Sequence, residues 1–185
     1  MDIAEIGTPF IIQDGVRAVS EIKKSFPRLE VLADLKIMDA GEHESAQGFA
    51  AGADYVTVLG ASDNATILGT VASARKYGKA VMVNMIGVAD LEKRALEIEA
   101  LGVDYLCVHT AFDVQSTNNP LEELQRLKSA VKKAKTAVAG GIKLSTVDAI
   151  AALHPDILIV GGGIMNAADP RAAAAAIRER MERSV

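Results

Sequence analysis

Short apolar runs recur along the chain, and longer mixed stretches separate them. The runs are continuous rather than alternating, which is typical of strands that are covered on both faces in a parallel sheet. Each run has the length of a single strand. The predicted strands are residues 3–6, 31–35, 55–58, 81–85, 105–108, 136–139 and 157–160.

The stretches between these runs carry apolar residues at steps of three and four, the spacing of one face of a helix. In residues 90–101 this face holds Leu91, Ala95, Ile98 and Leu101. Pro120 suits the first turn of another helix. The predicted helices are residues 14–26, 63–77, 90–101, 120–134, 145–153 and 170–181.

One segment of the chain is repeated. Residues 51–58 (AGADYVTV) are similar to residues 101–108 (LGVDYLCV), and residues 154–160 (HPDILIV) form a looser third copy. The period is about 50 residues, longer than most solenoid repeats. Each copy reads as a helix end followed by a short strand, and its acidic residue is Asp54, Asp104 or Asp156.

Regular alternation of strand and helix predicts a parallel α/β fold, which is either a closed barrel or an open doubly wound sheet. No strand is followed by the GxGxxG turn of a dinucleotide-binding sheet. Polar residues and glycines instead follow many different strands, as in a ring of barrel loops. We therefore predict one domain over residues 1–185, a TIM (β/α)8-type barrel with seven βα units that lacks the first unit.

Composition narrows the class of protein. The 185 residues are 50% hydrophobic with a net charge of −4, enough apolar surface for a folded core. No apolar run approaches the length of a membrane span, and no basic and apolar leader begins the chain. Acidity and 4% aromatic residues argue against a nucleic-acid surface. The single cysteine, Cys107, fits a reducing compartment, so we expect a cytoplasmic protein.

The densest group of polar residues is Asp34, Lys36 and Asp39. Asp34 and Lys36 are two positions apart in a strand and so point to the same face, which in a barrel is the lumen. Asp39 follows the strand end at the rim. A buried acid and amine can stabilise an enolate charge and bind a metal. The alternative is a structural ion pair, which offers little net stability.

Two further residues belong with this group. Glu5 interrupts the first strand near its end, and together with Asp34 it would supply the oxygen ligands that Mg²⁺ prefers. His109 ends the fifth strand, where it could transfer protons near neutral pH or be a hydrogen-bonded core residue. The three histidines show no spacing typical of zinc.

Glycines follow the last two strands at Gly140, Gly141, Gly161 and Gly162. Glycine lets the backbone approach a ligand and direct its N–H groups toward an anion. The loops after the last two barrel strands commonly form a phosphate site. The residues alone therefore predict a barrel enzyme for a small phosphorylated substrate, and they leave the reaction open.

These residues resemble the orotidine 5′-monophosphate decarboxylase suprafamily, and within it the 3-hexulose-6-phosphate synthase family. The matching stretches span nearly all of the chain. They include Asp34-x-Lys36-x-x-Asp39, residues 5–9, 51–60 and 108–110, and the glycine pairs. The sibling 3-keto-L-gulonate 6-phosphate decarboxylases carry arginines after the histidine and after the last glycines, where this chain has His109-Thr-Ala-Phe-Asp113 and Gly162.

The resemblance implies a Mg²⁺-dependent aldol reaction that joins formaldehyde and D-ribulose 5-phosphate to give D-arabino-hex-3-ulose 6-phosphate, or the reverse. It implies Glu5 and Asp34 as metal ligands, Lys36 and His109 as catalytic residues, and the four glycines as the phosphate site. It also implies a homodimer in which Asp39 reaches the neighbouring active site.

Two features depart from the family pattern. The family chain normally begins with a further strand and helix, and Asn84 stands where its strand usually offers an acid. Asparagine keeps hydrogen-bonding capacity but cannot act as a base. These departures leave three alternatives: a decarboxylase-like lyase, an aldolase that uses Lys36 as a Schiff-base nucleophile, and a catalytically impaired barrel that binds sugar phosphates.

Overall fold

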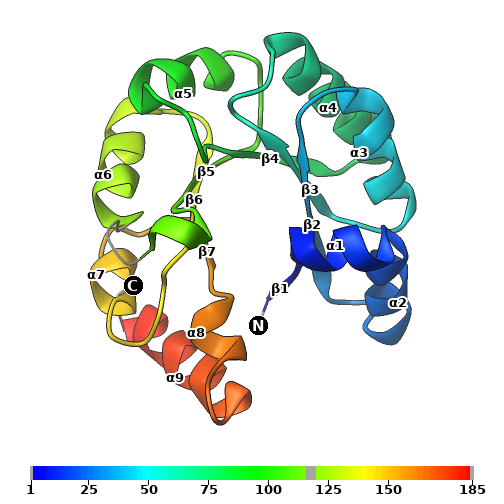
Figure 1. The fold of residues 1–185 in the computed structure, drawn as a ribbon. Helices are drawn as coiled ribbons and strands as arrows, with labels where there is room; N and C mark the ends of the chain where they lie inside the picture. Colours follow the sequence, from blue (N-terminus) through cyan, green and yellow to red (C-terminus); the bar gives the residue numbers. More distant parts are fainter. Residues whose placement is uncertain (1, 116–119, 184–185) are drawn as a thin grey trace.

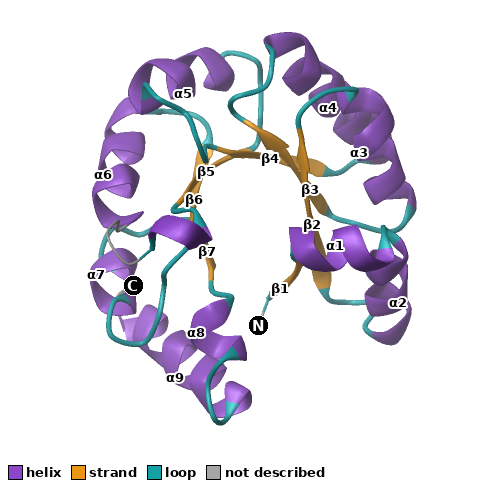
Figure 2. Cartoon of the chain, viewed as in Figure 1, coloured by secondary structure: helices purple, strands orange, loops and turns teal. Residues whose placement is uncertain are grey.

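The computed structural model describes residues 2–115 and 120–183. Seven parallel strands form one sheet in the order β1-β2-β3-β4-β5-β6-β7, and the sheet curls into a nearly closed ring with helices outside it (Figures 1 and 2). The predicted barrel of seven βα units is confirmed. The strands are β1 (Ile3–Ile6), β2 (Glu30–Ile37), β3 (Tyr55–Leu59), β4 (Ala80–Asn84), β5 (Tyr105–His109), β6 (Lys135–Ala139) and β7 (Ile157–Ile159).

The helices follow the strands around the outside of the ring (Figure 2). Of these, α1, α3 and α8 lay outside the predicted ranges. The helices are α1 (Thr8–Asp14), α2 (Arg17–Ser25), α3 (Gly41–Ala50), α4 (Asn64–Tyr77), α5 (Leu91–Glu99), α6 (Pro120–Ala130), α7 (Val147–Ala151), α8 (Gly162–Met165) and α9 (Pro170–Arg183), with a 3-10 turn at Phe112–Val114.

Two predicted helices were wrong in their limits, each for a local reason. The helix predicted over residues 14–26 is divided at Gly15, whose φ of 62° turns the chain between α1 and α2. The helix predicted over residues 120–134 ends at Ala130. Beyond it, the Glu99 carboxylate accepts hydrogen bonds from the backbone N–H groups of residues 132–134, which satisfies them outside a helix.

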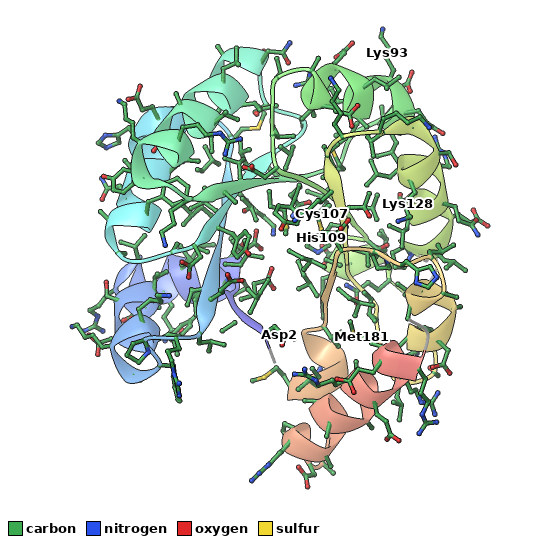
Figure 3. All side chains as sticks on the ribbon, turned by 180° about the vertical axis from the view of Figure 1, so that it is seen from behind. Asp2, Lys93, Cys107, His109, Lys128 and Met181 are labelled. Carbon is green, nitrogen blue, oxygen red and sulfur yellow. The ribbon has the colours of Figure 1, made fainter. Side chains whose placement is uncertain are left out.

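Both faces of the sheet are covered, which explains the continuous apolar runs. The outer face packs on the helices and includes Val31, Val56, Val83, Leu106, Val108 and Val138. The inner face fills the lumen with a separate cluster of Leu32, Met82, Cys107, Ala137 and Ala139. Figure 3 shows Cys107 inside the ring, whereas Lys93 and Lys128 project outward from the helices.

The repeated acids lie at the N-terminal end of the barrel. Each carboxylate accepts a hydrogen bond from the first residues of a neighbouring strand: Asp54 from the N–H of Val31 (2.9 Å), Asp104 from that of Val81 (2.8 Å), and Asp156 from that of Thr136 (2.8 Å). The repeat is therefore structural, because it ties adjacent strands at the end opposite the predicted site.

The ring has two sheet edges, β1 and β7, which do not pair with each other in the described part of the chain. An ion pair between Arg178 of α9 and Asp2 (3.3 Å) links the last helix to the segment before β1. None of the helices within residues 2–115 and 120–183 is long and apolar enough to cross a membrane.

Candidate active site

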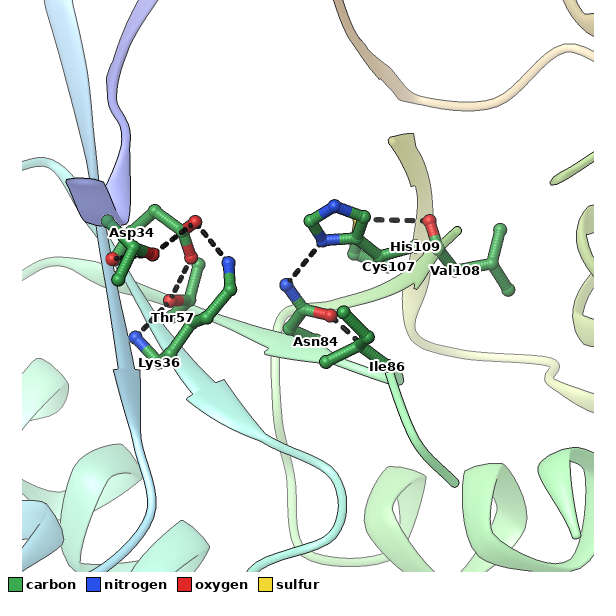
Figure 4. Close-up of polar contacts among 9 residues, drawn as sticks. Asp34, Lys36, Thr57, Asn84, Ile86, Cys107, Val108 and His109 are labelled. Carbon is green, nitrogen blue, oxygen red and sulfur yellow. Dashed lines mark hydrogen bonds and ion pairs between the residues drawn. The ribbon is translucent and has the colours of Figure 1, made fainter. Parts of the chain in front are cut away.

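The polar centre of the lumen is built on an irregularity in β2. Ala33 is in register with Val56 of β3, but Ile37 is in register with Val58, so β2 has two extra residues between these points. Lys36 lies in this bulge with a φ of 47°, a conformation that non-glycine residues seldom adopt. Its side chain turns back and forms an ion pair with Asp34 (Figure 4). The predicted shared face of these two residues is confirmed.

Asp34 is buried, with 5% of its surface exposed, and both of its carboxylate oxygens are hydrogen-bonded. The Thr57 hydroxyl donates to Oδ1 (2.8 Å), and the Thr8 hydroxyl lies 2.8 Å from Oδ2, the oxygen that Lys36 contacts. Burial opposes ionisation, but the Lys36 charge and the three hydrogen bonds outweigh it and lower the pKa of Asp34. The carboxylate is therefore charged at neutral pH.

Thr8 and Thr57 were not predicted as site residues. Thr57 also accepts a hydrogen bond from the backbone N–H of Lys36 (2.9 Å) and so fixes the bulge. Its signal in the sequence is a single polar residue on the inner face of an apolar strand. Thr8 follows β1 and gives no such signal, because it approaches Asp34 only through the folding of β1 beside β2.

Glu5 lies on β1, paired with Leu32 of β2, and its side chain is reached by solvent from the lumen. It makes no hydrogen bond within the described ranges. The surrounding protein and the Asp34 carboxylate raise the pKa of Glu5 to about 7, and the Lys36 ammonium opposes this rise. Glu5, Asp34 and Lys36 are thus close enough to interact electrostatically, as the sequence predicted.

His109 ends β5 on the other side of the lumen from Lys36 (Figure 4). Its Nδ1 lies 2.9 Å from the Asn84 side-chain nitrogen, and Asn84 Oδ1 accepts from the N–H of Ile86 (3.1 Å). Burial and the Lys36 charge lower the pKa of His109, and Asp34 opposes them. The predicted histidine is therefore neutral and held by a side chain of the neighbouring strand.

Two glycine loops lie together beside this centre. Gly140 and Gly141 follow β6 with φ values of 86° and 71°, and a Cβ on Gly140 would lie 2.2 Å from the Thr110 carbonyl oxygen. Gly161 and Gly162 follow β7, and a Cβ on Gly163 would lie 2.4 Å from the carbonyl oxygen of Ile142 in the first loop. Glycine is therefore required for the close approach of the two loops as well as for their turns.

Asp39 is exposed just after β2 and has no hydrogen-bond partner among residues 2–115 and 120–183. It does not join the Asp34–Lys36 pair. A hollow of about 630 Å³ lies between the loops after β3 and β4. It is lined by Ser62, Asn64 and Arg94 rather than by the lumen residues, so it is separate from the candidate active site.

The fold and the site agree with what is known of related proteins. The family model described as "Orotidine 5'-phosphate decarboxylase / HUMPS family" matches residues 1–177. The chain belongs to this family. Within it, the chain is 55% identical over 180 residues to a 3-hexulose-6-phosphate synthase of Bacillus subtilis (strain 168), covering 97% of this chain and 86% of that protein.

Two other members of the family are similarly related. A protein of Staphylococcus saprophyticus named 3-hexulose-6-phosphate synthase 3 is 48% identical, covering 98% of this chain and 87% of its own length. The crystal structure of the 3-hexulose-6-phosphate synthase from Salmonella typhimurium superposes with a TM-score of 0.98 at 46% identity, covering 100% of this chain and 88% of that one. The resemblance read from the sequence is confirmed.

Proposed function

We propose that this chain is a 3-hexulose-6-phosphate synthase, an aldehyde-lyase that joins formaldehyde to D-ribulose 5-phosphate. The product is D-arabino-hex-3-ulose 6-phosphate, and the reaction is reversible. The observation that carries the proposal is the Asp34–Lys36 ion pair in the lumen, facing His109, in a chain 55% identical to a protein of that name. The absence of arginine at Gly162 favours the synthase over the related decarboxylase.

The sugar phosphate is oriented by the two glycine loops. Gly140, Gly141, Gly161 and Gly162 would present backbone N–H groups to its phosphate, as in the loops after the last strands of other barrels. The reacting carbons would then extend toward Lys36 and His109 in the lumen. Both loops are positioned by backbone contacts, so this part of the site is rigid before the substrate binds.

Lys36 and Asp34 act on the charge that develops in the reaction. Removal of a proton from C1 of ribulose 5-phosphate gives an enediolate, whose C1 forms a bond to the formaldehyde carbon. The Lys36 ammonium lies where it can stabilise the enediolate oxygens, and Asp34 holds this ammonium in place. His109 would interact with an oxygen of the reacting groups from the opposite wall.

The residues present fit a magnesium ion. Glu5 has no other partner among the described residues, and its raised pKa shows that two neighbouring carboxylates lack a full counter-charge. No group of three acidic, histidine or cysteine side chains converges within residues 2–115 and 120–183. Glu5 and Asp34 would therefore hold Mg²⁺ together with water and substrate oxygens, and the ion would supply further stabilisation of the enediolate.

The ion pair also argues against Lys36 as a Schiff-base nucleophile. An amine must lose its proton to attack a carbonyl, and contact with the Asp34 carboxylate favours the charged form. Borohydride treatment in the presence of ribulose 5-phosphate is therefore expected to leave the mass of the protein unchanged. A stable adduct on Lys36 would replace the enediolate mechanism by a Schiff-base one.

The decisive assay measures formaldehyde consumption with ribulose 5-phosphate, with and without chelation and then with Mg²⁺ restored. We expect turnover that chelation abolishes and Mg²⁺ recovers. Turnover that survives exhaustive chelation would refute the metal role. Binding of ribulose 5-phosphate without any formaldehyde consumption would instead support the catalytically impaired barrel.

We also propose a homodimer in which the exposed Asp39 completes the neighbouring site. Mixing the two inactive variants Asp39→Asn and Lys36→Met tests this, because a mixed dimer would contain one site with neither defect. Random mixing is then expected to restore about one quarter of the wild-type activity per chain. No recovery in mixtures shown by native mass spectrometry to contain mixed dimers would refute the shared site.

A further inference from the structure

The Asn84 side chain has a defined orientation. Its Oδ1 accepts the backbone N–H of Ile86 (3.1 Å), and an N–H group can only donate. The amide oxygen must therefore face Ile86, and the amide nitrogen faces His109 Nδ1 at 2.9 Å (Figure 4). The hydrogen-bond network thus assigns the two ends of this amide, which their shapes alone would not distinguish.

This orientation fixes where His109 carries its proton. The amide NH2 of Asn84 can only donate, so Nδ1 must offer a lone pair. The proton of the neutral imidazole is then on Nε2. Nε2 points away from Asn84 and has no hydrogen-bond partner in the described part of the chain (Figure 4).

We propose that Asn84 is a positioning residue that locks neutral His109 in the Nε2–H tautomer, so that His109 meets the substrate as a hydrogen-bond donor rather than as a base. The identity of the substrate rests on the proposed function, but the tautomer does not. A neutral imidazole donor can polarise a carbonyl oxygen, here that of formaldehyde or of the ribulose, without giving up its proton.

The surroundings of His109 agree with a neutral ring. Lys36 and Asp34 face it from β2, Glu5 lies beyond them on β1, and Cys107 precedes it on β5. Its register partner on β6 is Ala139, which carries no charge. An aspartate at position 84 would reverse the arrangement, because a carboxylate accepts a proton from Nδ1 and leaves the lone pair on Nε2.

The test is ¹⁵N NMR of the histidine rings in the whole chain, at a pH where His109 is neutral. The His109→Gln variant identifies the His109 signals among the three histidines. We expect a protonated Nε2 and a bare Nδ1 in the wild type. In Asn84→Asp we expect the proton on Nδ1 and a rise of about 1–3 units in the pKa of His109. Asn64→Asp adds the same charge beside Arg94, outside the lumen, and is expected to change neither.

A proton on Nδ1 in the wild type, or an unchanged tautomer in Asn84→Asp, would overturn the inference. A kinetic measurement separates it from the proposed function. If the chain is a synthase, the acid limb of its kcat/KM profile follows the His109 pKa upward in Asn84→Asp. If the NMR result is as expected but no formaldehyde is consumed, the tautomer stands and the proposed function fails.

Discussion

Lys36 turns back on Asp34, two residues before it in the same strand, and the two side chains form an ion pair inside the barrel. A regular strand would place them side by side on one face without this close contact. The bulge in β2 and the φ of 47° at Lys36 bring the ammonium onto the carboxylate. Backbone strain at this point is typical of a functional site, and the predictions below concern the groups that support it.

Replacing Lys36 by methionine should lower kcat for formaldehyde consumption by about 10²–10³-fold, the usual effect of losing one charge-stabilising donor. The fold should persist, because Thr8 and Thr57 still bind Asp34. Lys76→Met is the matched control, since Lys76 forms an exposed ion pair with Glu42 outside the lumen. Equal losses in the two variants would contradict a specific role for Lys36.

Thr57→Val should destabilise the protein and impair the site together. The hydroxyl accepts from Lys36 N–H and donates to Asp34, so valine leaves two buried polar groups unsatisfied, at about 1–3 kcal/mol. Urea denaturation measures the change in the free energy of unfolding. Thr57→Ser keeps the hydroxyl and should recover most of the stability and activity; a serine variant as unstable as the valine one would show that the methyl group matters instead.

Glu5→Gln should stabilise the metal-free protein at pH 8. Because the pKa of Glu5 rises from 4.5 to about 7 on folding, the folded state binds a proton that the unfolded state lacks between these values. Wild-type stability from this group therefore falls as pH rises through that window. Since solvent reaches the side chain, we expect a gain of about 1 kcal/mol or less at pH 8.

Thermal melts of wild type and Glu5→Gln across pH 4–8 check this, with each kcal/mol shifting Tm by about 2–4 °C. The difference should vanish at the acid end. Calorimetry at pH 8 should also show that Glu5→Gln has lost Mg²⁺ affinity. A variant that is less stable at pH 8 yet equal in the acid would contradict the sign of the effect.

Gly140→Ala should be destabilising by at least about 2 kcal/mol, because its φ of 86° disfavours a side chain and the Cβ would collide with the Thr110 carbonyl. Gly161 has a negative φ and open space around its Cβ position. Gly161→Ala should therefore fold normally and raise KM for ribulose 5-phosphate about tenfold, or 1.4 kcal/mol. An unchanged KM would place the phosphate elsewhere.

The elements that the sequence predicted well are those with a buried face. All seven strands were expected because their apolar runs serve both the lumen and the helices. In contrast, α1 has no buried residue, so no apolar stripe marks it. Glu99 ended α6 early by accepting backbone groups 33–35 positions away, a contact that no local pattern contains.

The sequence by itself determined the alternation of strands and helices, and it placed Asp34 and Lys36 on one face, because side-chain direction in a strand follows from spacing alone. Tertiary structure decided which groups these residues meet. Thr57 reaches Asp34 and Asn84 reaches His109 across 23 and 25 positions, respectively, once parallel strands pair in register. The protonation state of the site therefore depends on distances between strands, which the order of residues does not specify.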